Sequence, residues 1–452
     1  QLPVGDPTLS AKEIVGNESQ ERMGIVIREE DIEHIRQIAD RERAPFYVVG
    51  ETTGDHRFVF EQTDGVKPID LAMEDMFGKA PRTVMTDRTV EETYEDVTYD
   101  QTQLDEYVER VLQLEAVACK DWLTNKVDRS VTGKIARQQC QGEIQLPLSD
   151  CGVVALDYRG RAGIATSIGH APQAALVDPA AGSVLSIAEA LTNIVWAPLS
   201  EGLDSVSLSA NWMWPCKNEG EDARLYRAVE ACSDFACSLR INIPTGKDSL
   251  SMTQKYGKDK VYSPGTVIIS AGAEVSDIRK VVSPVLRTGV NSTIYYIDFS
   301  FDKLKLGGSA FAQSLDKIGK EVPTVQDSEY FANAFNAVQE LINKELILAG
   351  HDISAGGMIT TMLEMNFANT EGGLEVSLDE IPEKDLVKIL FSENPGILIQ
   401  VEKTDEVEKI LKKAGVAFIR LARPCDERHL LIHKDGADYQ FFIDHLRDVW
   451  FE

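Results

Sequence analysis

The sequence lacks the features that mark several large protein classes. No run of about 18 apolar residues occurs, so we expect no membrane span. The N-terminus lacks a basic segment followed by an apolar one, so we expect no signal peptide in this sequence. The chain begins with Gln rather than Met. Together with the motif order described below, this start predicts a chain cut from a longer protein.

Cysteine pairs and basic patches are also missing. The number of cysteines is odd and no CxxC pair occurs, which favours reduced thiols in the cytoplasm over a disulfide framework. The seven are Cys119, Cys140, Cys151, Cys216, Cys232, Cys237 and Cys425. Acids outnumber bases by 73 to 46, giving a net charge of -27, and no basic stripe interrupts them. We therefore expect no nucleic-acid partner and no anionic membrane surface. Phosphate ligands stay possible, because Mg²⁺ can bridge carboxylates to phosphates.

Length and composition indicate a soluble protein of several domains. At roughly 100–200 residues per domain, 452 residues predict two to four domains. Apolar residues make up 43% of the chain, which is enough to bury more than one core.

One pattern of elements occurs twice. Residues 23–27, 29–43, 46–49 and 56–60 read as strand, helix, strand and strand. The same order returns in residues 396–401, 406–413, 418–421 and 430–432. A constant shift of 372 positions relates the two without a gap, so we interpret them as an internal duplication. Between them we expect an amphipathic helix over 105–123, then apolar strands and helices to about residue 275, and a further domain opening with a strand at 293–297.

Four oxygen-bearing side chains stand at positions suited to a metal. Asp150 lies in a strand-like apolar run over 144–156, where a lone buried charge would be costly. Glu189 and Asn193 are four residues apart in a helical segment, which places both on one face. Asp352 ends a buried strand before a glycine turn, where α/β ligand sites form. Such oxygens suit Mg²⁺ better than zinc. The alternative is a helix-surface pair and a helix cap.

Other polar segments leave two interpretations open. Gly246-Lys247-Asp248-Ser249 follows a strand-like run and is either a phosphate-binding loop or an ordinary turn. The polar runs 17–22 and 391–395 each precede a core strand and are either ligand contacts or solvated turns. His170 and His351 are either acid–base groups or structural hydrogen-bonding residues.

Seven segments, in order, resemble the motifs of one enzyme family. They are 17–23 (NESQERM), 128–134 (DRSVTGK), 147–151 (PLSDC), 189–193 (EALTN), 209–213 (SANWM), 246–252 (GKDSLSM) and 351–357 (HDISAGG). Each motif is weak alone. Their order and spacing over essentially the whole chain resemble the large-type phosphoribosylformylglycinamidine synthases.

The resemblance implies a fold and a division into domains. The fold class is α/β (α+β), with A and B domains like those of aminoimidazole ribonucleotide (AIR) synthetase, duplicated about a pseudo-twofold axis and here partial. It implies that residues 1–95 are part of a first B domain with a linker, 96–290 a second A domain and 291–452 a second B domain. The first A domain and the C-terminal glutaminase would lie outside this chain.

The resemblance also implies an activity. ATP phosphorylates the amide oxygen of formylglycinamide ribonucleotide, and ammonia derived from glutamine then displaces phosphate to give the amidine. Mg²⁺ would offset the charge on the phosphates. The catalytic His of the family belongs to the first A domain, so no catalytic residue is assigned here and the chain alone is expected to be inactive.

Site residues follow from the resemblance position by position. The expected Mg²⁺ ligands are Asp150, Glu189, Asn193 and Asp352. The expected ATP or ADP contacts are Lys120, Ser149, Ser354 and Gly246. The expected substrate contacts are Glu18, Ser19, Gln20 and Ser249. Lys247 departs from small-type relatives, which carry a metal-binding Asn there.

Two other functions remain in view. One is another enzyme of the same superfamily, such as AIR synthetase or selenophosphate synthetase, which resembles one half only. The other is a non-catalytic scaffold in which Mg²⁺–ADP at the Asp150 site is structural.

Overall fold

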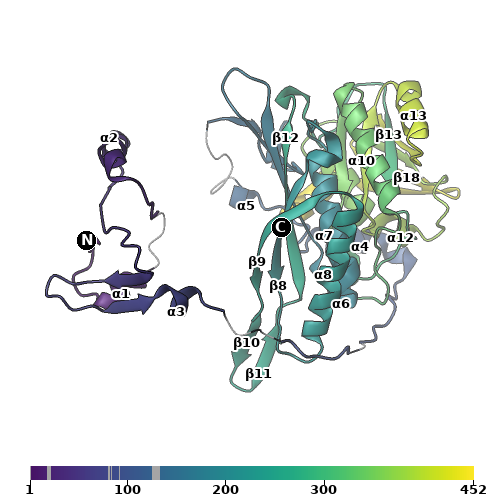
Figure 1. The fold of residues 1–452 in the computed structure, drawn as a ribbon. Helices are drawn as coiled ribbons and strands as arrows, with labels where there is room; N and C mark the ends of the chain where they lie inside the picture. The colour runs from purple at the N-terminus through teal and green to yellow at the C-terminus, as the bar shows by residue number, and fades with distance from the viewer. Residues whose placement is uncertain (1, 18–21, 80–81, 83, 91, 125–132) are drawn as a thin grey trace. The chain divides into compact units, whose positions relative to one another are not determined.

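The computed structural model describes residues 2–17, 22–79, 82, 84–90, 92–124 and 133–452. The chain divides into two compact units, Gln1–Met85 and Thr86–Glu452, coloured from purple to yellow along the chain in Figure 1.

The first unit contains short elements and no buried core. Its elements are α1 (Ala11–Val15), α2 (Ile32–Arg41), β1 (Arg57–Phe60), β2 (Ile69–Ala72) and α3 (Met73–Phe77). β1 and β2 form an antiparallel pair, with Arg57 bonded to Asp70 across it. None of the described residues of this unit is buried. Its elements therefore depend on local bonds, such as the capping box in which Ser10 and Glu13 bond each other at the start of α1.

The prediction of two strands in this unit is wrong. Residues 23–27 and 46–49 are irregular, and Met23 and Val26 are 89% and 83% exposed. A strand needs a neighbouring strand to accept its backbone hydrogen bonds and an apolar face to pack on, and in the described residues neither segment pairs with another strand. The expected helix is present as α2, and the strand at 56–60 as β1.

The second unit contains a six-stranded sheet followed by a seven-stranded one. The six strands run in the order β3 (Ile135–Arg137), β6 (Gly152–Ala155), β7 (Gly163–His170), β12 (Thr266–Val275), β8 (Ser207–Met213) and β9 (Asn242–Ser249). All neighbours are antiparallel except β8 and β9. A separate hairpin of β10 (Thr253–Tyr256) and β11 (Asp259–Tyr262) extends beyond the sheet in Figure 1. A further pair joins β4 (Cys140–Gln141) to β5 (Leu146–Pro147).

Three helices pack on the six-stranded sheet. They are α6 (Pro172–Val177), α7 (Pro179–Ile194) and α8 (Glu221–Ser238). Asp178 caps α7 by accepting a hydrogen bond from the Ala180 N–H at 2.9 Å, and Pro179 follows at the first helical position. A Cβ added to Gly169 of β7 would lie 2.2 Å from the Ser186 carbonyl oxygen. Glycine therefore lets α7, which carries Glu189 and Asn193, lie directly on β7.

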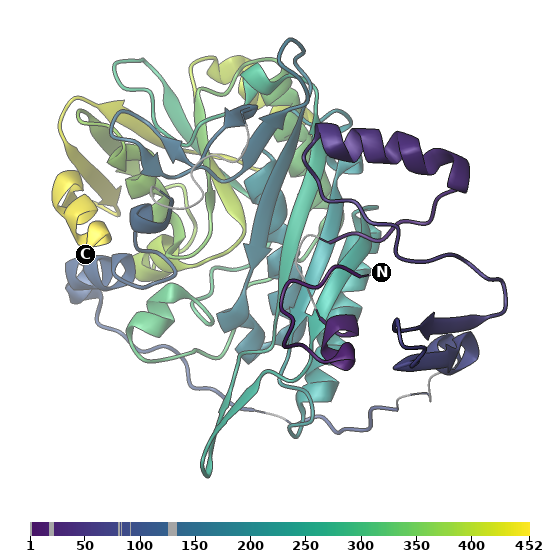
Figure 2. The same ribbon diagram turned by 90° about the vertical axis from the view of Figure 1, so that its left-hand side faces the viewer.

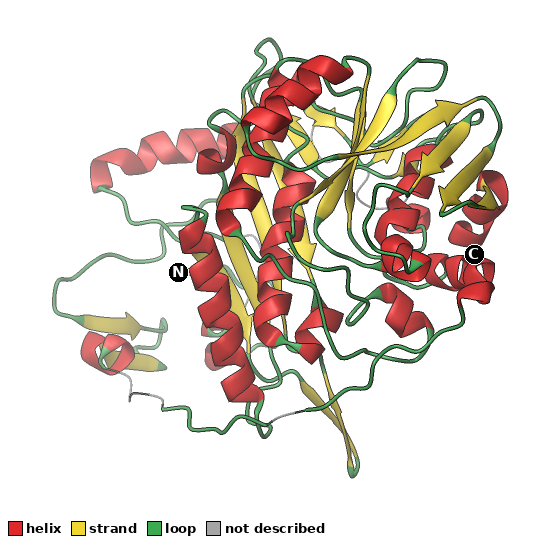
Figure 3. Cartoon of the chain, turned by 90° about the vertical axis from the view of Figure 1, so that its right-hand side faces the viewer, coloured by secondary structure: helices red, strands yellow, loops and turns green. Residues whose placement is uncertain are grey.

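The seven-stranded sheet forms the C-terminal part of the unit. Its order is β14 (Ala349–Ile353), β16 (Gly396–Val401), β13 (Thr293–Asp298), β17 (Ile419–Cys425), β15 (Gly373–Ser377), β18 (His429–Lys434) and β19 (Ala437–Phe442). The helices that pack around it are α9 (Ala310–Ser314), α10 (Ser328–Asn343), α11 (Gly357–Phe367), α12 (Leu386–Phe391), α13 (Thr404–Lys413), α14 (Ile443–Phe451) and α4 (Leu104–Leu112). Figure 3 shows these helices in red around the yellow strands.

Alternate residues of the central strands enter two different cores. In β13, Tyr295 and Ile297 join the core that also contains α7, α10 and the six-stranded sheet. Ile294 and Tyr296 join the core built with α4, α11 and α14. Side chains alternate along a strand, so one strand serves both cores. Because the first core contains residues of both sheets, the two sheets of this unit pack as one body, seen as teal and green-to-yellow layers in Figure 2.

The second copy of the duplicated pattern forms as predicted. β16, α13, β17 and β18 cover the expected strand, helix, strand and strand. The expected helix over 105–123 is wrong in its second half. α4 ends at Leu112, and a short α5 (Asp121–Thr124) follows. The Cys119 N–H donates to the Trp450 carbonyl of α14 at 2.9 Å, so a tertiary contact holds this segment instead of a helical one.

The predicted domain boundaries stay predictions. The two compact units divide between Met85 and Thr86, while the two large sheets span 135–275 and 293–442. Among the described helices, none has the length and apolar character needed to cross a bilayer. Six cysteines are free thiols: Cys119, Cys151, Cys216, Cys232, Cys237 and Cys425.

Candidate functional site

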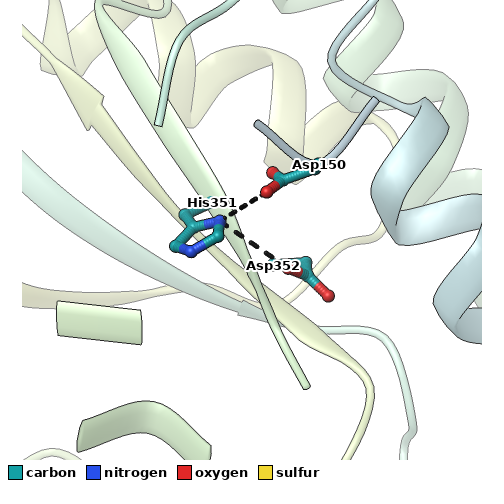
Figure 4. Close-up of side chains that lie close together, drawn as sticks. All are labelled: Asp150, His351 and Asp352. Atoms are coloured by element: carbon teal, nitrogen blue, oxygen red, sulfur yellow. Dashed lines mark ion pairs between the residues drawn. The ribbon is translucent and has the colours of Figure 1, made fainter. Parts of the chain in front are cut away.

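Two acids from distant parts of the second unit meet at one histidine (Figure 4). His351 and Asp352 are neighbours in β14, whereas Asp150 lies in a bend between β5 and β6. The strand-like segment expected over 144–156 is interrupted, because the chain bends at 150–151 between β5 and β6. His351 Nδ1 lies 2.7 Å from Asp150 Oδ1 and 3.6 Å from Asp352 Oδ1. All three side chains are buried, at 8% exposure or less.

A third acid contacts the other ring nitrogen of His351. Nε2 lies 2.9 Å from Glu364 Oε2 on α11. Burial lowers the pKa of His351, but Asp150 and Glu364 outweigh burial, and the net effect raises the pKa well above its usual value. Burial raises the pKa of Asp352 well above its usual value, and Asp150 adds to this. We therefore assign His351 as imidazolium, one positive charge facing several acids.

One oxygen of each of these two aspartates is left without a hydrogen-bond donor among the described residues. Asp150 Oδ2 and Asp352 Oδ2 are buried and accept no hydrogen bond from the described residues. Buried carboxylate oxygens without a partner are costly. One donor atom from each of Asp150, His351 and Asp352 lies within 4.8 Å of the others. This arrangement fits a divalent cation held by the carboxylate oxygens, which suits Mg²⁺, while the His351 imidazolium has no free lone pair and acts as a counter-charge.

The other two predicted metal ligands lie nearby but make different contacts. Glu189 Oε2 accepts from the His170 backbone N–H at 2.5 Å and lies 3.5 Å from its Nδ1. Burial is the main cause of the raised pKa of Asp352, and the negative charge of Glu189 adds to it. Asn193 Nδ2 donates to the Ile168 carbonyl of β7 at 2.9 Å. The structure thus brings Asp150 and Asp352 together, pairs Glu189 with His170 and engages Asn193 with β7.

A pocket adjoins these acids inside the second unit. Its volume, open mouth included, is about 770 Å³. Its wall is formed by the segment after β7, the glycine segment before α9 and the segment after β14, represented by His170, Gly308 and Ser354. Glu189 and Glu393 add two carboxyl groups to the wall. With two carboxyl groups in its wall, the pocket would need cations before it could accept an anionic ligand.

The predicted nucleotide contacts divide between two places. Ser354 lines the pocket, and the buried hydroxyl of Ser149, next to Asp150 in the chain, makes no hydrogen bond to any described residue. Lys120 is half-buried, and its Nζ donates to the Ala118 carbonyl at 2.9 Å. Gly246 and Ser249 lie on the edge strand β9, so the ordinary turn expected there is wrong, while phosphate binding by this segment stays a prediction.

The predicted substrate contacts are described in part. Lys247 Nζ donates to the Ser249 hydroxyl on β9. Glu18, Ser19 and Gln20 lie outside the described residues. His170 contacts Glu189, whose hydrogen bond raises the pKa of the imidazole against the effect of burial.

Sequence reasoning missed two acids of the site. Glu364 lies at the thirteenth position after His351, in the next helix, and no local spacing rule links the two. Glu393 was visible only as part of the polar run 391–395. That run precedes a strand with six buried residues, which was the available signal that its carboxyl group is not in solvent.

Two domain families match the chain. Residues 119–274 match the FGAR-AT PurM_N-like domain. Residues 1–62 and 292–429 match the AIR synthase related protein, C-terminal domain. The same C-terminal family therefore matches both copies of the duplicated pattern.

Curated relatives match nearly the whole chain. The phosphoribosylformylglycinamidine synthase of Homo sapiens is 37% identical over 93% of the chain, which spans 33% of that protein. The enzyme of the same name from Dictyostelium discoideum is 37% identical over 91%, spanning 32%. A probable chloroplastic/mitochondrial phosphoribosylformylglycinamidine synthase of Arabidopsis thaliana is 36% identical over 99%, spanning 33%. The chain thus spans about a third of the length of these relatives.

Solved structures share the fold. T. maritima PurL complexed with FGAR aligns with a TM-score of 0.58 and 17% identity, covering 76% of this chain and 53% of that one. PurLQS from Thermotoga maritima aligns with a TM-score of 0.55 and 15% identity, covering 83% of this chain and 53% of that one. The fold is therefore the AIR-synthetase-like α/β fold predicted from the sequence.

Proposed function

Since the chain belongs by homology to the phosphoribosylformylglycinamidine synthase family, we propose that it supplies the nucleotide-binding part of such an enzyme. The reaction is the ATP-dependent conversion of formylglycinamide ribonucleotide to its amidine, with ammonia derived from glutamine. The observation that carries the proposal is the buried acid cluster with unused carboxylate oxygens beside a pocket, in a chain 37% identical to a named enzyme over 93% of its length.

Within this proposal the ligand of the pocket is Mg²⁺–ADP or Mg²⁺–ATP. Asp150 and Asp352 would hold a Mg²⁺ ion through the oxygens that accept no hydrogen bond from the described residues. Glu189 would take part from the pocket wall, and Asn193 would join them from the next turn of α7. Bound Mg²⁺ supplies positive charge that offsets the phosphates. Related T. maritima PurL proteins have been solved in complex with ATP and with ADP, which supports this ligand class.

The chain's own groups orient the ligand. His351 holds Asp150 through its Nδ1, while Glu364 holds the imidazole through Nε2. Ser149 places an unused hydroxyl beside Asp150. Ser354 lines the pocket after β14. These fixed positions reduce the entropy lost when a nucleotide binds.

The same proposal names a substrate and a location for the protein. Formylglycinamide ribonucleotide would contact Ser249 on β9, while the other expected contacts, Glu18, Ser19 and Gln20, lie outside the described residues. T. maritima PurL has been solved in complex with FGAR, which supports this substrate. No catalytic residue is assigned within this chain. Turnover with glutamine would also need a first A domain and a glutaminase domain; added ammonia can replace the glutaminase but not the first A domain. The proposed location is the cytoplasm, which fits the free thiols.

The alternative function is a non-catalytic scaffold, in which Mg²⁺–ADP at the Asp150 site stabilises the fold. The favouring observation is that the acids and the pocket lie within one compact unit that shares a core across both sheets. AIR synthetase and selenophosphate synthetase are less favoured, because the curated relatives carry the other name.

Analysis of retained nucleotide and two ligand titrations separate these functions. The purified chain is analysed for retained nucleotide, and Mg²⁺–ADP and formylglycinamide ribonucleotide are titrated separately by calorimetry. Binding of both supports the synthetase assignment, and binding of Mg²⁺–ADP alone supports the scaffold. If neither ligand binds and no nucleotide is retained, the proposed function is wrong.

A further inference from the structure

One carboxyl group joins two segments of the pocket wall that are far apart in the sequence. Glu393 lies between α12 and β16, and its Oε1 accepts hydrogen bonds from the Ala310 and Gly356 N–H groups, both at 2.8 Å. Ala310 ends the segment 307–310, and Gly356 belongs to the segment 354–357. We call these the first and second glycine segments; residues of each line the pocket.

The glycine segments have few means of holding their own shape. Their sequences are Gly-Gly-Ser-Ala and Ser-Ala-Gly-Gly, so they offer little side-chain volume for packing. Gly308 and Gly356 adopt φ of +66° and +91°, the left-handed region that other residues rarely enter. Glycine also leaves the unfolded chain with more freedom to lose on ordering. Bonds from outside therefore help to fix each segment: Gly307 and Gly308 donate to the Glu321 and Ile318 carbonyls, and Glu393 accepts from both segments.

Glu393 is itself held firmly. Burial raises its pKa to about 7, against the two N–H groups, which favour the ionised form. The next residue, Asn394, is 2% exposed, and its Nδ2 donates to the Ser300 hydroxyl and to the Lys303 carbonyl, both at 3.1 Å. A buried carboxyl group with two backbone donors and an anchored neighbour makes a rigid link.

We propose that Glu393 is a positioning residue that fixes both glycine segments, and thereby the part of the pocket wall on which the phosphates of a bound nucleotide depend. The identity of that ligand rests on the proposed function. Ser354 belongs to the second segment, so Glu393 also determines where this predicted nucleotide contact lies. Glu393 acts through backbone groups, so its loss should loosen two distant segments together.

Hydrogen–deuterium exchange on the ligand-free chain tests the link directly. Glu393→Ala should raise exchange about 10-fold at Ala310 and Gly356, since each amide loses a hydrogen bond to a buried carboxyl group. The strands β13 and β16 should be unchanged. Glu393→Gln keeps an uncharged acceptor oxygen and should show a smaller increase, which guards against a variant that fails to fold. Glu408→Gln is the matched control, because Glu408 on α13 accepts from the side chains of Arg420 and Lys412.

The affinity for Mg²⁺–ADP gives the second measurement. It should fall about 10-fold in Glu393→Ala, less in Glu393→Gln and not in Glu408→Gln. Unchanged exchange at either glycine segment in both Glu393 variants overturns the inference, as does a rise that spreads equally over β13 and β16 in Glu393→Gln. If the unaltered chain binds no Mg²⁺–ADP, the proposed function fails, while the exchange result still decides the role of Glu393.

Discussion

His351 Nδ1 lies 2.7 Å from Asp150 Oδ1, and this contact joins the two large sheets of the second unit. His351 belongs to β14 of the seven-stranded sheet, and Asp150 precedes β6 of the six-stranded sheet. Two elements about 200 residues apart thus meet through one ion pair, and the protein places its unused carboxylate oxygens at that junction.

Removal of the imidazole should destabilise the fold. In His351→Gln, Asp150 and Asp352 stay buried without their counter-charge, and losing one partner of a buried pair costs about 3–5 kcal/mol. Urea unfolding in EDTA measures the loss, and excess Mg²⁺ should restore part of it. His445→Gln is the control, because His445 pairs with Glu109 at the surface with 60% of its side chain exposed. Equal stability of the two variants would argue against a buried charged site.

Removal of Asp150 should abolish stabilisation by nucleotide. With ligand at about 100 times its Kd, binding to the folded state should add about 2.7 kcal/mol to the unaltered chain. Asp150→Ala should lose this increment, because the cation loses an oxygen ligand. Thermal unfolding with and without Mg²⁺–ADP measures it. Asp234→Ala, an exposed acid on α8, should respond like the unaltered chain. An equal response from Asp150→Ala would contradict a ligand role.

Glu393 should make stability depend on pH. Its pKa is raised from 4.5 to about 7 because burial favours the neutral form. The folded state therefore binds this proton more tightly than the unfolded state does. The resulting stabilisation is fully present below pH 4.5 and is lost as pH rises through about 7.

The comparison with Glu393→Gln isolates this group. Between pH 4.5 and 7 the unaltered chain should lose about 3 kcal/mol more than the variant, since each pKa unit corresponds to about 1.4 kcal/mol. The other titrating groups are the same in both proteins, so their contributions cancel. Urea unfolding across this pH range supplies the measurement, and parallel profiles would show that Glu393 is not buried as described.

A methyl group between β7 and α7 should disturb the site from a distance. In Gly169→Ala the new Cβ would meet the Ser186 carbonyl oxygen at 2.2 Å and the Ala190 nitrogen at 2.3 Å. Backbone atoms cannot give way easily, so the expected cost is about 3 kcal/mol, with a displacement of the helix that carries Glu189. Gly272→Ala is a matched control in β12, where the nearest atom would be 4.0 Å away. Similar melting temperatures for the two variants would contradict this close packing.

Sequence periodicity predicted the parts of the fold that have neighbours to pack on. β16, α13 and β17 formed where the alternation of apolar residues indicated. The same pattern in residues 23–27 gave no strand, because Met23 and Val26 face solvent and no described neighbour pairs with them. The local pattern of apolar residues shows which secondary structure a segment can form, and tertiary contacts decide whether that structure forms.

The sequence predicted two acids of the site but did not predict which residues they contact. Asp150 and Asp352 stood out because a charged residue in an apolar run needs a partner. The partner, His351, is adjacent to Asp352, yet sequence alone could not tell a structural histidine from an acid–base one. Glu364 and Glu393 joined the site only through folding, as their contacts reach across α11 and across two glycine segments.

Side chains of β13 point alternately into the two cores, and this limits where residues can be inserted or deleted. Inserting one residue in that strand would exchange the sides of all later side chains, so that Tyr295 and Ile297 would trade places with Ile294 and Tyr296. Aromatic and aliphatic groups would then fill volumes shaped for others in both cores at once. Insertions and deletions should therefore be tolerated in the segments between strands, and rejected within β13 even when the added residue is apolar.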